Sequence, residues 1–195
     1  MMKKMSFQEK WVLLTKYENK PALTKKNIKS ICVLANDKDA LVRTEAYDSL
    51  SAFPSKHAQK FLKQAIVHEP NALARSYAIL SWAAITQALG VHKKQKKFLK
   101  QIKKLPKIKK SEHCMLSFYY AKYVLWHKKS LKKLLAFLNS SDYQICCCAV
   151  NLLWDIVSPE NRQSIKQALE QLLQREVCAS VSENAAELLQ YIKTA

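Results

Sequence analysis

The sequence predicts an all-α protein built from antiparallel helix pairs, and three observations indicate this fold class. Glycine occurs once in 195 residues, at Gly90, whereas sheet proteins need glycine where a turn or bulge requires a positive φ angle. Apolar residues make up 49% of the chain and recur at helical spacing, and no proline interrupts these periodic segments. Five segments also share a small residue that is followed four positions later by a large apolar one.

Prolines and capping residues mark where the helices are expected to begin and end. Pro54 precedes Ser55, a good N-cap, and Pro106 is expected to end a lysine-rich helix. The segment 158–160, Ser-Pro-Glu, combines an N-cap, a proline at the first helical position and an acid in the first turn. Gly90 is expected to close a helix in the left-handed conformation. Further N-caps are expected at Thr24, Asn71 and Ser111.

About eleven amphipathic segments lie between these marks, and each is expected to be a helix. Their short connections, none longer than seven residues, force consecutive helices to pack antiparallel. The segments are residues 6–18, 25–35, 40–53, 56–68, 71–89, 92–104, 112–127, 129–138, 143–157, 160–174 and 178–193.

An internal repeat is the strongest signal in the sequence. Its five copies have successive alanine offsets of 32, 43, 28 and 36 residues, and the first two also carry an arginine, Arg43 or Arg75, three residues before the alanine. Residues four apart share a helical stripe, so the alanine admits a neighbouring helix and the large residue fills the layer. The pairs are Ala46/Leu50, Ala78/Trp82, Ala121/Leu125, Ala149/Leu153 and Ala185/Leu189.

The segment 36–46, with an acidic turn, then Val-Arg, then Ala, resembles the HEAT-repeat family, in particular its small bacterial members with repeats similar to those of phycobilisome lyases (PBS lyases). The resemblance implies one domain over 1–195, a right-handed superhelical stack of about five helix pairs that serves as a scaffold for protein binding. In such stacks the second helices line the concave side. This would place six residues on or near a common inner surface: Arg43, Tyr47, Arg75, Lys122, Tyr123 and Trp126.

Charge divides the chain unevenly. Residues 1–138 hold 29 basic and 8 acidic side chains, whereas residues 139–195 hold 4 and 7, so a strongly basic part precedes a mildly acidic one. Residues 93–133 contain 15 lysines and a single acid, Glu112. The candidate binding lysines in the densest stretch are Lys93, Lys96, Lys97, Lys100, Lys103 and Lys104.

Two interpretations of this lysine-rich strip stay open. It is either a solvated outer face or a surface for an anionic partner, since an unneutralised strip repels itself. The candidate partners are an acidic protein, which repeat surfaces favour, a nucleic acid, and, with less support, an anionic membrane surface. Tyr119, Tyr123 and Trp126, with Lys122 beside them, form a stripe that is either core or a second contact surface.

The sequence offers no chemistry for catalysis. One glycine excludes a Gly-rich phosphate loop, and the five histidines form no metal-binding pair. Adjacent helical residues point about 100° apart, so neither His113 with Cys114 nor the run 146–148 of three cysteines makes a metal site. We therefore expect no catalytic residue, no metal and no cofactor. The six cysteines, with no export signal or transmembrane stretch, indicate reduced thiols in the cytoplasm.

The sequence thus predicts a non-enzymatic adaptor that binds an acidic macromolecule, most readily a protein. The alternative is a nucleic-acid-binding protein similar to the HEAT-like DNA glycosylases that remove alkylated bases. That resemblance implies tryptophans, an aspartate and an arginine in the active site. Trp82, Trp126, Trp154 and Asp155 supply residue types of this kind, although Trp154 and Asp155 are adjacent and arginine is scarce.

Overall fold

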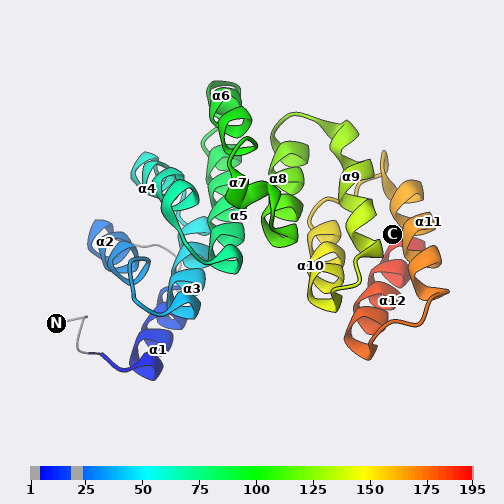
Figure 1. Cartoon of the computed structure of the whole chain (residues 1–195), viewed down its shortest axis with the longest axis horizontal. Coiled ribbons are helices and arrows are strands. Elements are labelled where there is room, and N and C mark those ends of the chain that lie inside the picture. The colour runs from blue at the N-terminus through cyan, green and yellow to red at the C-terminus, as the bar shows by residue number, and fades with distance from the viewer. Residues whose placement is uncertain (1–4, 19–23, 195) are drawn as a thin grey trace. The chain divides into compact units, whose positions relative to one another are not determined.

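The computed structural model describes residues 5–18 and 24–194, and within these ranges it is all-helical, with no strand. The all-α prediction is therefore confirmed. The chain divides into two compact units, Met1–Trp126 and His127–Ala195 (Figure 1).

The first unit has two layers of helices. In one layer α1, α3, α5 and α8 pack side by side in that order. In the other layer α2 packs against α3, α4 packs against α5, and α6 contacts both α5 and α8. Short connections impose this arrangement, because each helix must return antiparallel to the one before it. The helices are α1 (Phe7–Glu18), α2 (Lys25–Leu34), α3 (Ala40–Ser51), α4 (Lys56–His68), α5 (Ala72–Ala88), α6 (His92–Ile102), α7 (Pro106–Lys109) and α8 (Glu112–Leu125).

The second unit is smaller. Its helix α12 packs against both α10 and α11, and η3 packs against α10. The segment expected as one helix over 129–138 is helical but mixed, because only its centre is α-helical and both ends are tighter 3₁₀ turns. The elements are η2 (Lys128–Ser130), α9 (Leu131–Leu135), η3 (Ala136–Asn139), α10 (Tyr143–Trp154), α11 (Arg162–Leu173) and α12 (Ala179–Thr194).

Most of the expected helix ends are confirmed. Gly90 follows α5 with a φ of 63°, the left-handed conformation that closes a helix without steric cost only for glycine. Four of the expected N-caps each accept a hydrogen bond from a backbone N–H in the first turn of the helix that follows. These N-caps are Thr24, Ser55, Asn71 and Ser111.

Two expected boundaries are wrong. Pro106 begins the short helix α7 instead of ending α6, because a proline at the first helical position needs no N–H partner. The cap of α11 is Asn161, not Ser158. The Asn161 side chain accepts from the Ser158 N–H at 2.8 Å and donates to the Ile156 carbonyl at 2.7 Å, so segment 158–160 is a turn that precedes the helix.

The core explains the alanine repeat. All five alanines are buried, and so are the five large residues four positions later. Trp82, the largest of them, has no exposed surface, and its ring meets Phe98 of α6 edge-on with centroids 5.1 Å apart. The small residue thus faces a neighbouring helix where two backbones come close, and the large one fills the layer between helices.

Candidate functional site

A buried ion pair joins successive helix pairs in the first unit. The guanidinium of Arg43, on α3, contacts the carboxylate of Glu69 in the α4–α5 turn through two hydrogen bonds: Nη2 to Oε1 at 2.7 Å and Nε to Oε2 at 2.8 Å. Nη1 of Arg43 also donates to the carbonyls of Asp37 and Lys38, in the α2–α3 turn. One side chain therefore holds two consecutive turns together.

Glu69 has its carboxylate fully occupied. The Tyr47 hydroxyl donates to Oε2 at 2.9 Å, and the Asn71 N–H donates to Oε1 at 2.9 Å. Burial raises the pKa of Glu69, but the hydrogen bonds from Arg43, Asn71 and Tyr47 outweigh it and hold that pKa below its usual value. Burial and the contact with Glu69 raise the pKa of Tyr47, so this phenol stays neutral.

Arg75 and Lys10 repeat this arrangement on the neighbouring helices. Arg75, on α5, donates to the carbonyl of Glu69 and, at 3.4 Å, to that of Lys107. Lys10, on α1, pairs with Asp37 at 2.7 Å. Each cation is the fourth residue of its helix. Lys10 and Arg43 reach the turn of the next helix pair, and Arg75 reaches the short helix α7. We call Lys10, Arg43 and Arg75, with their acceptors, the cation ladder.

The sequence prediction missed two members of the cation ladder, Lys10 and Glu69. Lys10 lies 33 residues before Arg43, close to the 32-residue spacing between Arg43 and Arg75, and this spacing could have identified it. Glu69 carried no such signal, because its role depends on where the α4–α5 turn lies in space.

The residues expected on a common inner surface are mostly inside the protein. Arg75, Tyr47 and Tyr123 are 2%, 3% and 3% exposed, so they offer no surface to a macromolecular partner. Arg43 is partly buried and held by Glu69. The structure thus brings Arg43, Tyr47 and Arg75 together at the cation ladder, where they join helix pairs.

The aromatic stripe of α8 is only partly accessible. Tyr119, Lys122 and Trp126 are half-buried on this helix, and Tyr119 and Trp126 pack against the core of the first unit. Trp82, one of the tryptophans in the glycosylase-like alternative, is entirely buried and cannot contact a base.

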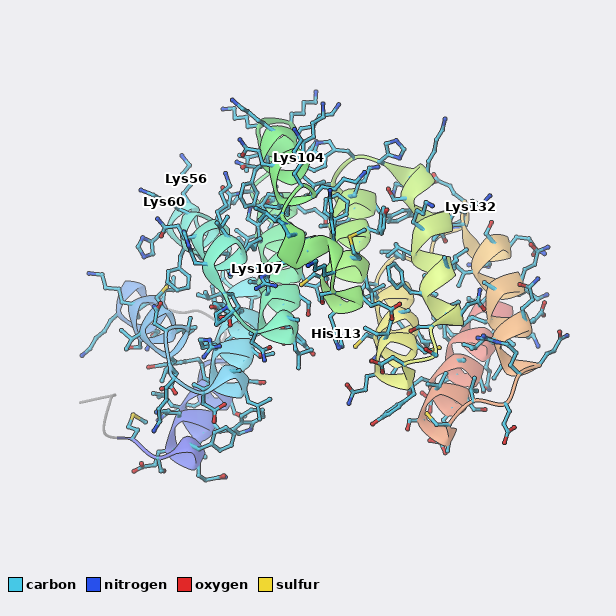
Figure 2. All side chains as sticks on the ribbon, in the orientation of Figure 1. Lys56, Lys60, Lys104, Lys107, His113 and Lys132 are labelled. Carbon is cyan, nitrogen blue, oxygen red and sulfur yellow. The ribbon has the colours of Figure 1, made fainter. Side chains whose placement is uncertain are left out.

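The expected binding lysines Lys93, Lys96, Lys97, Lys100, Lys103 and Lys104 lie on α6 and in the turn after it. Further lysines on α4, on α6 and in segment 107–110 extend this basic surface. All are exposed except Lys63, which is half-buried with its ammonium 5.0 Å from the centre of the Phe98 ring, so that α4 and α6 are neighbours here. Lys56 and Lys60 extend from α4, and Lys104 extends just beyond the end of α6 (Figure 2). This lysine surface comprises Lys56, Lys60, Lys63, Lys93, Lys94, Lys96, Lys97, Lys100, Lys103, Lys104, Lys107, Lys109 and Lys110.

The lysine surface is not neutralised. Within the described residues, no salt bridge involves any of its thirteen lysines. The same five residues, Lys-Phe-Leu-Lys-Gln, occur at 60–64 in α4 and at 97–101 in α6. Both helices bury the leucine and expose the first lysine and the glutamine, so α4 and α6 present similar basic faces.

A hollow of about 380 Å³ lies beside the lysine surface, between α2 and α4. Arg43 and Tyr47 line it together with the ends of both helices and the turns that follow them. Its apolar lining comes from Ala35, Phe61, Ala65 and Pro70, and its polar lining includes Asn36, Gln64 and His68.

No metal or thiol chemistry is evident at this site. In residues 5–18 and 24–194, no group of three or more His, Cys, Asp or Glu side chains could hold a metal ion. All six cysteines are free thiols, and burial raises the pKa of Cys32 to about 11. Nor is any described helix long and apolar enough to cross a membrane.

The sequence matches no protein-family model and no curated protein. Membership of the HEAT-repeat family therefore stays a prediction.

Proposed function

We propose that this chain is a non-enzymatic binding protein of HEAT-like architecture, with its helix pairs stacked in a right-handed superhelix. The cation ladder supports this proposal, because the same helix position carries the cation in α1, α3 and α5, and each cation reaches a segment beyond its own helix pair: a turn for Lys10 and Arg43, and the short helix α7 for Arg75. A single helix pair cannot bury its apolar faces alone, so ties between neighbours suit a stacked array.

The partner that we propose is an acidic macromolecule, in the first place an acidic protein, bound by the lysine surface. The observation that carries this proposal is the absence of any ion pair to its thirteen lysines among the described residues. Clustered charges of one sign destabilise a folded domain, and a partner of opposite charge removes that cost. The six free cysteines fit a protein that works in a reducing compartment such as the cytoplasm.

Nucleic acid is the second candidate, since contacts to phosphates need little more than positive charge. Base recognition in single strands also uses exposed aromatic rings, and Phe98, the aromatic residue of α6, instead packs on Trp82 beneath Lys63. The hollow beside α4 suits an amino-acid side chain of a protein partner better than the regular sugar-phosphate backbone of a nucleic acid. Both features favour a protein partner.

A binding titration with matched variants tests the proposal. Fluorescence anisotropy would follow a labelled Asp/Glu-rich peptide, a DNA duplex and a single-stranded RNA from about 50 to about 200 mM salt. In one variant Lys93, Lys96, Lys97 and Lys100 become glutamine, and in the control Lys128, Lys129, Lys132 and Lys133 do.

We expect the α6 variant to bind the peptide roughly tenfold or more weakly, because each exposed ion pair contributes about 0.2–1 kcal/mol, whereas the control should lose less. Equal losses in the two variants would contradict a specific surface. If the DNA duplex or the RNA binds more tightly than the peptide, and in a salt-sensitive way, the partner is a nucleic acid and not a protein.

A further inference from the structure

We propose that the hollow between α2 and α4 binds one large apolar or aromatic side chain of an acidic peptide segment in the partner protein. This inference rests on the proposed function and deepens it, because it adds an anchor to the electrostatic attraction of the lysine surface.

The size and lining of the hollow fit such an anchor. Its volume of about 380 Å³ lies near the lower end for small-ligand pockets, enough for one large side chain and the adjoining backbone. Its apolar lining combines Phe61 and Ala65 of α4 with Ala35, directly after α2, and with Pro70. Aromatic anchors that fill pockets contribute most of the affinity at protein interfaces.

The floor of the hollow carries no uncompensated charge. The guanidinium of Arg43 is paired with Glu69, and the carboxylate of Asp37 is paired with Lys10. The Tyr47 hydroxyl is already donated to Glu69. An apolar side chain that enters the hollow therefore displaces water without leaving a charged group unpaired.

The rim can bind the backbone of a peptide. Gln64 and His68 are exposed, one turn apart on α4, and neither side chain has a hydrogen-bond partner in the part of the chain that the structure describes. The Asn36 amide nitrogen donates to the Cys32 carbonyl at 2.7 Å, and its oxygen is left to accept from a peptide N–H.

The charge around the hollow determines the character of the peptide. Lys60 lies one helical turn before Gln64 on α4, Lys56 lies one turn before Lys60, and both are exposed and extend from the helix (Figure 2). Lys38, in the turn after α2, is exposed as well. Aspartates and glutamates on both sides of the anchor would therefore pair with lysines from α4 and from the α2–α3 turn.

Two labelled peptides test this proposal on the full chain. Both contain the same run of Asp and Glu, and one has a central phenylalanine where the other has alanine. We expect the unaltered protein to bind the phenylalanine peptide roughly tenfold more tightly, as burial of an aromatic side chain predicts. Two substitutions should reduce this preference to less than about twofold: Ala65→Leu, which fills the hollow, and Gln64→Trp, which covers it from an exposed position.

The control is the double variant Lys56→Gln, Lys60→Gln. It should weaken both peptides by a similar factor and keep the preference for phenylalanine. Thermal unfolding checks that each variant folds, and Gln64→Trp decides the question if Ala65→Leu does not fold. Equal binding of the two peptides, or a preference that survives both substitutions, overturns the hollow as an anchor site while the lysine surface stands. Failure of both peptides to bind overturns the proposed function itself.

Discussion

Arg43 and Glu69 belong to successive helix pairs, and two hydrogen bonds, 2.7 and 2.8 Å long, join their side chains where both are mostly buried. The Glu69 side chain is 2% exposed and that of Arg43 is 12% exposed. Such a pair costs desolvation energy when it forms, so its value lies in fixing one arrangement of the neighbouring turns.

Replacement of Arg43 by leucine should destabilise the protein by about 3 kcal/mol, because it leaves the carboxylate of Glu69 buried without its cation. Urea unfolding followed by circular dichroism measures the change. Lys38→Leu, at an exposed position in the adjacent turn, is the control and should change stability by less than about 0.5 kcal/mol. The double variant Arg43→Leu, Glu69→Leu should recover part of the loss. A double variant that loses the sum of both single effects would show that the two residues act independently.

Acid should weaken the protein through Glu69. The pKa of this carboxyl is lowered in the folded state, so its contribution to stability is present above the ordinary glutamate pKa, about 4.3, and is lost as the pH falls through the folded pKa. Glu69→Gln should therefore be less stable than the unaltered protein at pH 7, and the difference should shrink below about pH 4. Chemical unfolding across this range measures it, and a constant difference would contradict the role of Glu69.

Ala78 should not tolerate a larger side chain. It is entirely buried on α5, where neighbouring helices approach closely, so Ala78→Leu should cost about 1–3 kcal/mol by overpacking. Ala84→Leu, on the same helix but exposed, is the matched control and should have little effect. Thermal unfolding compares the two. Similar losses of stability in both variants would indicate that leucine destabilises α5 for a reason other than overpacking.

The thiols should divide into reactive and protected groups. Cys178 is exposed, whereas Cys32 and Cys114 are buried, and burial raises the pKa of Cys32 to about 11. At pH 8 an aromatic disulfide reagent should modify Cys178 quickly and the two buried thiols only after unfolding. The variant Cys178→Ser should lose one fast-reacting thiol, and Cys32→Ser should lose none. Fast modification of Cys32 in the native protein would require that α2 opens readily.

Local sequence predicted the helices well because local interactions determine them. The single glycine, the capping residues Ser55 and Asn71 and the helical spacing of apolar residues act within a few positions. The two wrong ends, at Pro106 and Asn161, lie in connections where a proline can begin a helix or occupy the turn before it. The alanine repeat predicted the core because a buried small residue and its large neighbour share one helical stripe.

The candidate site was only partly predictable. Exposure of the α6 lysines follows from their arc opposite Leu99 and Ile102, which are buried. The hollow between α2 and α4 could not be predicted, because its lining comes from α3 and α4 and from the turns that follow α2 and α4.

The sequence by itself determined the fold class, the positions of the helices and the basic character of residues 1–138, since periodicity and charge are properties of the chain. Only the tertiary structure decided the roles of Arg43 and Arg75. The resemblance to HEAT repeats predicted them on a concave binding face, but the α4–α5 turn that carries Glu69 and the helix α7 that carries Lys107 supply acceptors to them instead. A guanidinium inside the protein finds its acceptors on neighbouring segments of the chain, so these side chains join helix pairs and the exposed lysines are left for a partner.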